Sequence, residues 1–462
     1  MSECTKGSKN IFENERLIKL IMKFSIPCVI ALLADSLYGI VDQIFIANGV
    51  GFIGNAATNI AFPISVIAIG FGLMFGDGGA ALYSMKLGEK DIEGAIKVVH
   101  NSIAMLVLCG ILFTLCGYLF MPQLLNIFGA TDTNYTLAKE YLFYSLPGLT
   151  FLICACGLSA IIRADGDPKY SMGAVLSGAF INLILDIIFI FGFNMGIKGA
   201  AIATAVGEIL SGCIALSYLR KFKNINLTQK VFKMSAKIIS RISLIGISDL
   251  ITQICVGIII IVSNNMLALY GAQSIYGSEV CLSAMAIVMK VNEIFMAIII
   301  GIAAGGQPIA GYNYGAKNYR RVKDTFICLV KITTVVAIIG FIFFRFFPYA
   351  IVRLFGQSDY LFNNFAVKAM KIYLCMYILN GFELTSSIFL QSIGKPYKAI
   401  ILTISKQFIF IIPLLLILPQ YFEVYGVLYA GPISEICSFI AAFIVMFYEI
   451  KNIEKLQIMK DC

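Results

Sequence analysis

Long apolar segments recur along the whole chain and decide which solvent it folds in. Each is about 20 residues or longer, the length that a helix needs to cross a bilayer, and short polar or Gly/Pro-containing stretches separate them. Hydrophobic residues make up 59% of the chain and charged residues 13%, about half the share in soluble proteins. The pattern predicts an all-α integral membrane protein with twelve transmembrane helices. These segments cover residues 16–47, 56–86, 94–120, 136–162, 168–192, 198–221, 238–270, 280–314, 322–347, 364–391, 396–418 and 424–450.

Lysine and arginine gather in alternate loops between these segments. The densest run extends from Arg220 to Arg241, and smaller groups lie at Lys317–Lys323 and Lys451–Lys460. By the positive-inside rule we expect these loops and both termini in the cytoplasm of a multi-pass cell-membrane protein, with Asp132 and Asp359 on the outer side. The net charge of +9 is spread over seven loops without a nucleic-acid-binding motif, so no nucleic-acid partner is expected.

The chain repeats itself at a shift of 227 or 228 positions. The segment Asn126–Asp132 recurs as Arg353–Asp359, and Gly78-Gly79 recurs as Gly305-Gly306, both 227 positions later. Several matches at one shift indicate duplication. Further matches join Gly166 to Gly394, Gly199 to Gly426 and Glu208 to Glu435.

Six spans per repeat is an even number, so both halves enter the membrane in the same direction. The sequence therefore predicts two six-helix bundles related by a pseudo-twofold axis along the membrane normal. We place the first lobe at residues 1–218, a cytoplasmic linker at 219–241 and the second lobe at 242–462.

Asp42 and Asp186 each lie well inside an apolar segment. An ionisable side chain at that depth costs about 3 kcal/mol on insertion scales, so a functional role is the first hypothesis. Asn182 precedes Asp186 by one helical turn, and Thr204 adds a hydroxyl from the sixth span. Carboxylate, amide and hydroxyl oxygens suit Na⁺, and the same carboxylates could carry a proton. The alternative is that the two acids only hold helices together.

Pro27 and Asp35 lie in the same span as Asp42. Pro27 removes a helical hydrogen bond and permits a bend, and Asp35 shares a face with Asp42, two turns away.

The second half lacks the polar pair of the first. Phe410 and Leu414 stand where the repeat places Asn182 and Asp186. Lys290 and Glu293 are three residues apart and are expected to pair on one helix face. The roles of three further intramembrane charges stay open: Lys331, Glu383 and Lys406.

The sequence lacks the motifs of several classes of function. No phosphate-binding loop of the Gly-x-x-x-x-Gly-Lys-Ser/Thr type is present, and no kinase, metalloprotease or haem signature appears. We expect a protein that is not an enzyme, needs no cofactor and draws its work from an ion gradient.

Taken together, several short motifs resemble the multidrug and toxic compound extrusion (MATE) family, especially its branch of DinF- and MepA-like exporters. The resemblance covers essentially the whole chain. It rests on Val41-Asp42-Gln43, Gly54-Asn55-Ala56-Ala57, Arg163-Ala164-Asp165-Gly166-Asp167-Pro168, Asn182-x-x-Leu185-Asp186, Gly199 to Thr204, and Gln307-Pro308 with Tyr312-Asn313-Tyr314-Gly315.

The resemblance implies export of cationic or amphipathic small molecules by a monomer in the lipid bilayer, driven by Na⁺ or H⁺. It implies a cation site at Asp42, Asn182, Asp186 and Thr204, with Tyr141 as a polar neighbour. Pro27 matches the family's first-helix proline, and Asp35 is an additional acid in this chain. The coupling ion stays open. The runner-up is a lipid-linked precursor flippase of the same superfamily, which generally has fourteen spans and a basic cavity.

Overall fold

The computed structural model describes residues 11–131, 133–227, 234–353 and 360–461. Their regular secondary structure is helical, as expected where lipid leaves no water to satisfy backbone groups. The predicted outer-side residues Asp132 and Asp359 lie outside the described residues.

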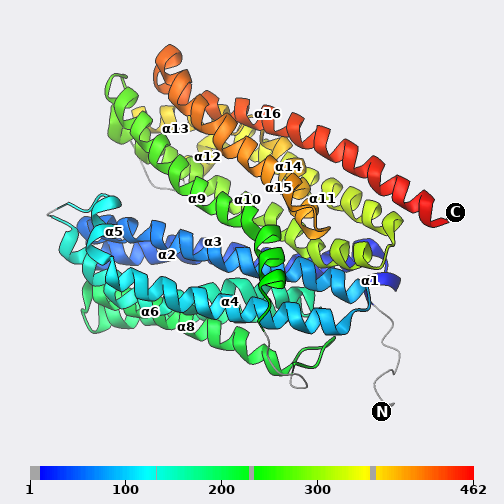
Figure 1. Cartoon of the computed structure of the whole chain (residues 1–462). Coiled ribbons are helices and arrows are strands. Elements are labelled where there is room, and N and C mark those ends of the chain that lie inside the picture. The colour runs from blue at the N-terminus through cyan, green and yellow to red at the C-terminus, as the bar shows by residue number, and fades with distance from the viewer. Residues whose placement is uncertain (1–10, 132, 228–233, 354–359, 462) are drawn as a thin grey trace.

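Figure 1 shows two bundles that converge at the end carrying α1 and the C-terminus and diverge towards the end carrying α5 and α13. The N-terminal bundle contains α2 (Leu17–Gly49), α3 (Phe52–Gly88), α4 (Ile92–Leu119), α5 (Met121–Ile127), α6 (Tyr135–Ala164), α7 (Pro168–Asp186) and α8 (Gly196–Ser217), with α1 (Ile11–Asn14) before it. The C-terminal bundle contains α9 (Ala236–Ala272), α10 (Ser278–Gly315), α11 (Tyr319–Phe346), α12 (Pro348–Arg353), α13 (Tyr360–Tyr373), α14 (Asn380–Ser392), α15 (Pro396–Ile404) and α16 (Ile412–Asp461).

The prediction of twelve membrane-crossing segments is confirmed for the described residues. Ten helical stretches are long and apolar enough to cross a membrane, and α13 with α14 forms one more that is bent by 44°. The stretch Pro396–Asp461 joins two helices at a kink, where Glu423 has a φ of 52°. It therefore supplies two of the predicted segments.

The duplicated halves share their turns as well as their helices. α4 and α11 begin at Ile92 and Tyr319, 227 positions apart, and each is capped by the residue before it. Asp91 accepts a hydrogen bond from the Gly94 backbone N at 2.8 Å, and Asn318 accepts one from the Arg321 backbone N at 3.4 Å. These caps satisfy backbone donors that the first helical turn leaves free.

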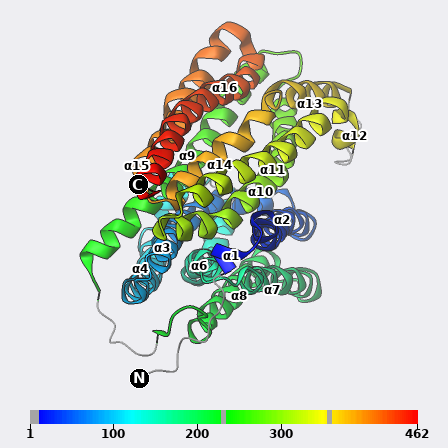
Figure 2. The same ribbon diagram turned by 90° about the vertical axis from the view of Figure 1, so that its right-hand side faces the viewer.

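The bundles meet along a seam formed by α2 and α3 from one and α9 and α10 from the other (Figures 1 and 2). A Cβ atom added to Gly78 would overlap the Ile242 oxygen, and one added to Gly246 would overlap the Met74 oxygen. Main chains approach this closely only where side chains are absent. The seam lies towards the end that carries the basic loops around Lys90 and Lys317, which we call the basic end.

Asp165 anchors the segment that follows the N-terminal bundle. Its carboxylate accepts hydrogen bonds from the hydroxyl groups of Tyr83 at 2.6 Å and Tyr218 at 2.9 Å. It also accepts from the backbone N atoms of Lys223 at 2.7 Å and Asn224 at 3.2 Å. The start of the range predicted as a linker is thus tied to the first bundle, and the end of that range, from Ala236, is the first part of α9.

Candidate functional site

Three helices of the N-terminal bundle bring the four predicted cation-site residues together. Asp42 comes from α2, Asn182 and Asp186 from α7, and Thr204 from α8. The carboxyl groups of Asp42 and Asp186 are neighbours whose charges interact. The Asn182 Nδ2 atom donates to the Thr204 Oγ1 atom at 3.3 Å. The four side chains therefore form one polar pocket within an apolar bundle.

This pocket holds buried oxygen atoms with no hydrogen-bond partner. They are Oδ1 of Asp42, Oδ1 of Asn182 and both carboxylate oxygens of Asp186. The three residues are 7%, 1% and 0% exposed, respectively. Unpartnered buried acceptors are costly, and two adjacent carboxylates cannot both stay ionised without a compensating charge. A proton or a small cation in the pocket would satisfy these atoms.

The oxygen set fits a monovalent hard cation better than a transition metal. Beyond the two carboxyl groups, the donors are a neutral amide and a hydroxyl, which are ligands of hard cations. In the described part of the chain, no three His, Cys, Asp or Glu side chains are arranged to hold a metal ion.

A π-helical turn at Ile187–Gly192 follows Asp186 directly. Such turns inside α-helices are frequently found at functional sites. The turn also packs closely against the end of α2, where a Cβ atom at Gly49 would overlap the Ile190 side chain. The sequence analysis did not predict this turn, because Ile187–Gly192 reads as a continuation of the apolar helix.

Tyr141 and Glu208 border the pocket. The Tyr141 side chain lies beside Thr204, and its environment includes the charge of Asp42. The Glu208 Oε2 atom is buried without a partner and lies against Gly148, where a Cβ atom would overlap it. Glu208 thus adds a third carboxyl group near the pair.

Pro27 and Asp35 lie apart from the four pocket residues. Pro27 is buried in α2 near the seam, where the Ser25 hydroxyl donates to the Ile302 oxygen of α10 at 3.1 Å. Asp35 is exposed, and its charge interacts with those of Glu208 and Glu293.

The predicted pairing of Lys290 with Glu293 is wrong as a direct contact. Among the described residues no ion pair within 4.0 Å joins them. Glu293 lies beside Ser36 of the other bundle, and Lys290 interacts with it electrostatically. Helical spacing placed the two residues on one face but could not show what the opposite bundle offers.

Comparisons with known proteins agree over nearly the full length. The MatE family model matches residues 27–188 and 238–417. The chain belongs to the MATE family. The multidrug export protein MepA of Staphylococcus haemolyticus is 30% identical over 447 residues, covering 96% of this chain and 95% of that protein. MepA of Staphylococcus aureus strain N315 is 29% identical, covering 94% and 95%.

Solved MATE structures have the same fold. The multidrug transporter DinF-BH, solved as a complex, superimposes with a TM-score of 0.88 at 32% identity and covers 98% of this chain and 99% of that one. An outward-facing MATE transporter superimposes with a TM-score of 0.89 at 23% identity, covering 98% and 100%.

The C-terminal bundle of this MATE-family chain contains a second buried charge cluster. The Lys406 ammonium group pairs with Glu383 at 2.8 Å and with Glu435 at 3.2 Å, and it donates to the Asn380 Oδ1 atom at 3.2 Å. Lys406 lies in a π-helical turn, Ser405–Ile411. The sequence could not assign roles to Lys406 and Glu383, because the two residues are apart along the chain and only the fold shows that they meet.

Proposed function

We propose that the chain is a secondary active antiporter that exports cationic or amphipathic small molecules in exchange for Na⁺ or H⁺. The pocket of Asp42, Asn182, Asp186 and Thr204 would bind the coupling ion. Alternating access of the space between the two bundles would move the exported molecule. The names of the MepA and DinF-BH relatives support multidrug export.

The observation that carries this proposal is the adjacent pair of Asp42 and Asp186 with its unpartnered oxygen atoms. The pocket is electrostatically incomplete without a bound proton or cation. A transporter needs an ion site whose occupancy changes during the cycle, and an incomplete pocket provides one. A purely structural acid pair would be expected to have its oxygens satisfied.

Acids outside the pocket support a cationic substrate. Asp35 of α2 and Glu293 of α10 are both exposed, come from different bundles and interact electrostatically. A cation between the bundles would be attracted to both carboxylates. Phenylalanine and methionine are frequent in this chain, with 36 and 17 residues, and such side chains suit binding surfaces for ligands of varied shape.

The basic end is proposed to face the cytoplasm, because cytoplasmic loops are enriched in lysine and arginine. With the bundles joined at that end, the structure would correspond to the outward-facing state. Cysteines placed at Asn194 and Lys317, which lie at opposite ends, would test the orientation in a background without native cysteines. We expect external labelling of intact cells at Asn194 and labelling at Lys317 only after permeabilisation.

Transport into inside-out vesicles tests the function. A cationic rhodamine dye is supplied outside the vesicles, and a Na⁺ gradient or a pH gradient is imposed separately. We expect dye accumulation by the wild type, and its loss in Asp42→Asn and Asp186→Asn variants that are still inserted at normal levels. Asparagine keeps the shape of a protonated aspartate but cannot exchange an ion.

Asp324→Asn is the matched control, because Asp324 is an exposed aspartate at the basic end of α11. It should export as the wild type does. The proposal fails if Asp42→Asn and Asp186→Asn both accumulate dye at the wild-type rate under either gradient.

A further inference from the structure

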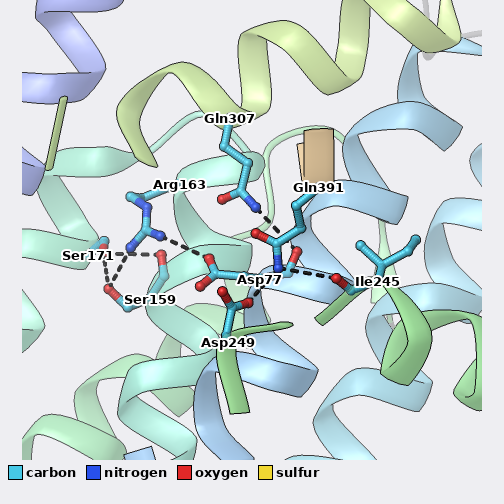
Figure 3. Close-up of polar contacts among 8 residues, drawn as sticks. All are labelled: Asp77, Ser159, Arg163, Ser171, Ile245, Asp249, Gln307 and Gln391. Atoms are coloured by element: carbon cyan, nitrogen blue, oxygen red, sulfur yellow. Dashed lines mark hydrogen bonds and ion pairs between the residues drawn. The ribbon is translucent and has the colours of Figure 1, made fainter. Parts of the chain in front are cut away.

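Two acids from different bundles meet at the seam. Asp77 belongs to α3 and Asp249 to α9, and Figure 3 shows their carboxyl groups pointing towards each other. Their charges interact directly. Neighbouring main chains are in contact here, because Gly78 and Gly246 leave no room for side chains. The two carboxyl groups therefore cannot move apart while the seam stays closed.

Hydrogen bonds from both bundles hold the two acids in place (Figure 3). The Arg163 Nη2 atom lies 3.4 Å from the Asp77 Oδ1 atom. The Gln391 Nε2 atom donates to the Asp249 Oδ2 atom and also to the Ile245 oxygen at 3.3 Å. Across the seam, the Gln307 Nε2 atom of α10 donates to the Asp77 backbone oxygen at 3.4 Å.

Charge is not balanced in this network. Arg163 is the one cation that faces the acid pair among the described residues, and its Nη1 atom also contacts the Ser159 hydroxyl at 3.4 Å. The other titratable groups facing Asp77 and Arg163 are the thiols of Cys28 from α2 and Cys156 from α6, which are uncharged at neutral pH. Gln307 and Gln391 are neutral. Two ionised carboxylates would leave a net negative charge at a site largely enclosed by protein.

We propose that the closed seam binds one proton at the Asp77–Asp249 pair, and that opening the seam releases it. On closing, a proton from water forms an O–H bond with one carboxylate oxygen, so the pair and Arg163 together become neutral. On opening, the bundles carry Asp77 and Asp249 apart, and the proton returns to water. This site is separate from the pocket of Asp42 and Asp186. The proposed binding and release of a proton here rests on the alternating access of the proposed function.

The proposal gives a definite pH response. If the closed seam holds one proton more than the open seam, the ratio of closed to open molecules falls by at most about tenfold per pH unit as pH rises. Neutralising either acid removes the excess charge, so Asp249→Asn and Asp77→Asn should both make the seam open less at high pH.

Spin labels at Lys90 and Lys317 can report the seam, since these exposed residues follow α3 and α10 at equivalent places in the two halves. Distances between the labels would be measured by pulsed electron paramagnetic resonance on the full chain in nanodiscs. The pH would be varied at fixed Na⁺ without substrate. Four proteins are compared, all without native cysteines: the parent, Asp249→Asn, Asp186→Asn and the double variant. Asp77→Asn repeats the test if Asp249→Asn does not fold, and Asp324→Asn is the control.

We expect the open, long-distance population to grow with pH in the parent, in Asp324→Asn and, to a smaller or equal extent, in Asp186→Asn. Asp249→Asn should reduce this growth, and the double variant should abolish it. The proposal is overturned if Asp249→Asn and Asp77→Asn respond to pH as the parent does, or if Asp186→Asn alone abolishes the response. Neither result contradicts the antiport proposal. That proposal is tested separately, by dye export, and its outcome does not depend on the distances measured across the seam.

Discussion

Gly88, the last residue of α3, packs against α10, and Gly315, the last residue of α10, packs against α3. The two glycines are 227 positions apart. A Cβ atom at Gly88 would overlap the Tyr312 oxygen, and one at Gly315 would overlap the Met85 oxygen. Met85 and Tyr312 are themselves 227 positions apart. The contact between α3 and α10 at the basic end is therefore reciprocal, and both halves of it depend on missing side chains.

A leucine at Gly88 should hold this contact open. Overpacking costs about 1–3 kcal/mol, so the ratio of closed to open molecules should fall by roughly 5-fold to 150-fold. The distance between labels at Lys90 and Lys317 measures the change. Gly173→Leu is the control, since a Cβ atom there meets nothing within 4 Å. A Gly88→Leu protein that remains as closed as Gly173→Leu would show that this close approach does not govern the seam.

Asp165→Ala should destabilise the N-terminal bundle and release the following segment. The substitution leaves the buried hydroxyls of Tyr83 and Tyr218 and the Lys223 backbone N without their acceptor. Each lost acceptor costs about 1–3 kcal/mol. Thermal unfolding and proteolysis after Lys221 would both report the loss. Asp167→Ala, nearby in the same turn, should have a smaller effect, because it removes a half-exposed ion pair with Lys223 and one helix-capping hydrogen bond from the Tyr170 N–H. Equal losses would contradict the role given to Asp165.

Asp91→Asn should reduce stability near neutral pH but not in acid. The hydrogen bond from the Gly94 N–H, helped by Lys86, lowers the pKa of the Asp91 carboxyl group. A carboxyl group with a lowered pKa stabilises the folded state above its unfolded pKa, near 3.9, and that contribution disappears as pH falls through the folded pKa.

Asparagine can still cap the helix, as Asn318 does in the second half. Melting temperatures of the wild type and Asp91→Asn, followed from pH 7 down to about 3, should therefore converge. A difference that is constant across this range would mean that the charge of Asp91 plays no part.

Lys406→Met should destabilise the C-terminal bundle strongly, because Glu383 and Glu435 lose their shared cation. Breaking a buried ion pair on one side costs about 3–5 kcal/mol. Adding Glu383→Gln to Lys406→Met should recover part of the loss. Lys331→Met is the control, since Lys331 is exposed. Equal melting temperatures for Lys406→Met and Lys331→Met would rule out a structural role for this cluster.

The sequence was sufficient to predict the twelve spans, because lipid requires long apolar segments. It also revealed the 227-residue repeat, because matches at one shift are the mark of duplication. It also singled out Asp42 and Asp186, since a charge in an apolar segment is visible without a structure. It could not show that Glu293 contacts Ser36, that Lys406 meets Glu383 and Glu435, or that Asp77 faces Asp249. Those relationships join helices distant in sequence, and spacing along one helix carries no information about its partners.

Competition between ion and substrate is the most direct test of the central claim that the pocket of Asp42 and Asp186 binds the coupling ion. Equilibrium binding of a cationic rhodamine dye to the purified protein is measured while Na⁺ replaces choline at constant ionic strength, and separately while pH is lowered. We expect Na⁺ or H⁺ to weaken dye binding to the wild type, and Asp42→Asn and Asp186→Asn to bind dye with an affinity that neither ion changes. Dye affinity that responds to the ions equally in the wild type and in both variants would contradict the account.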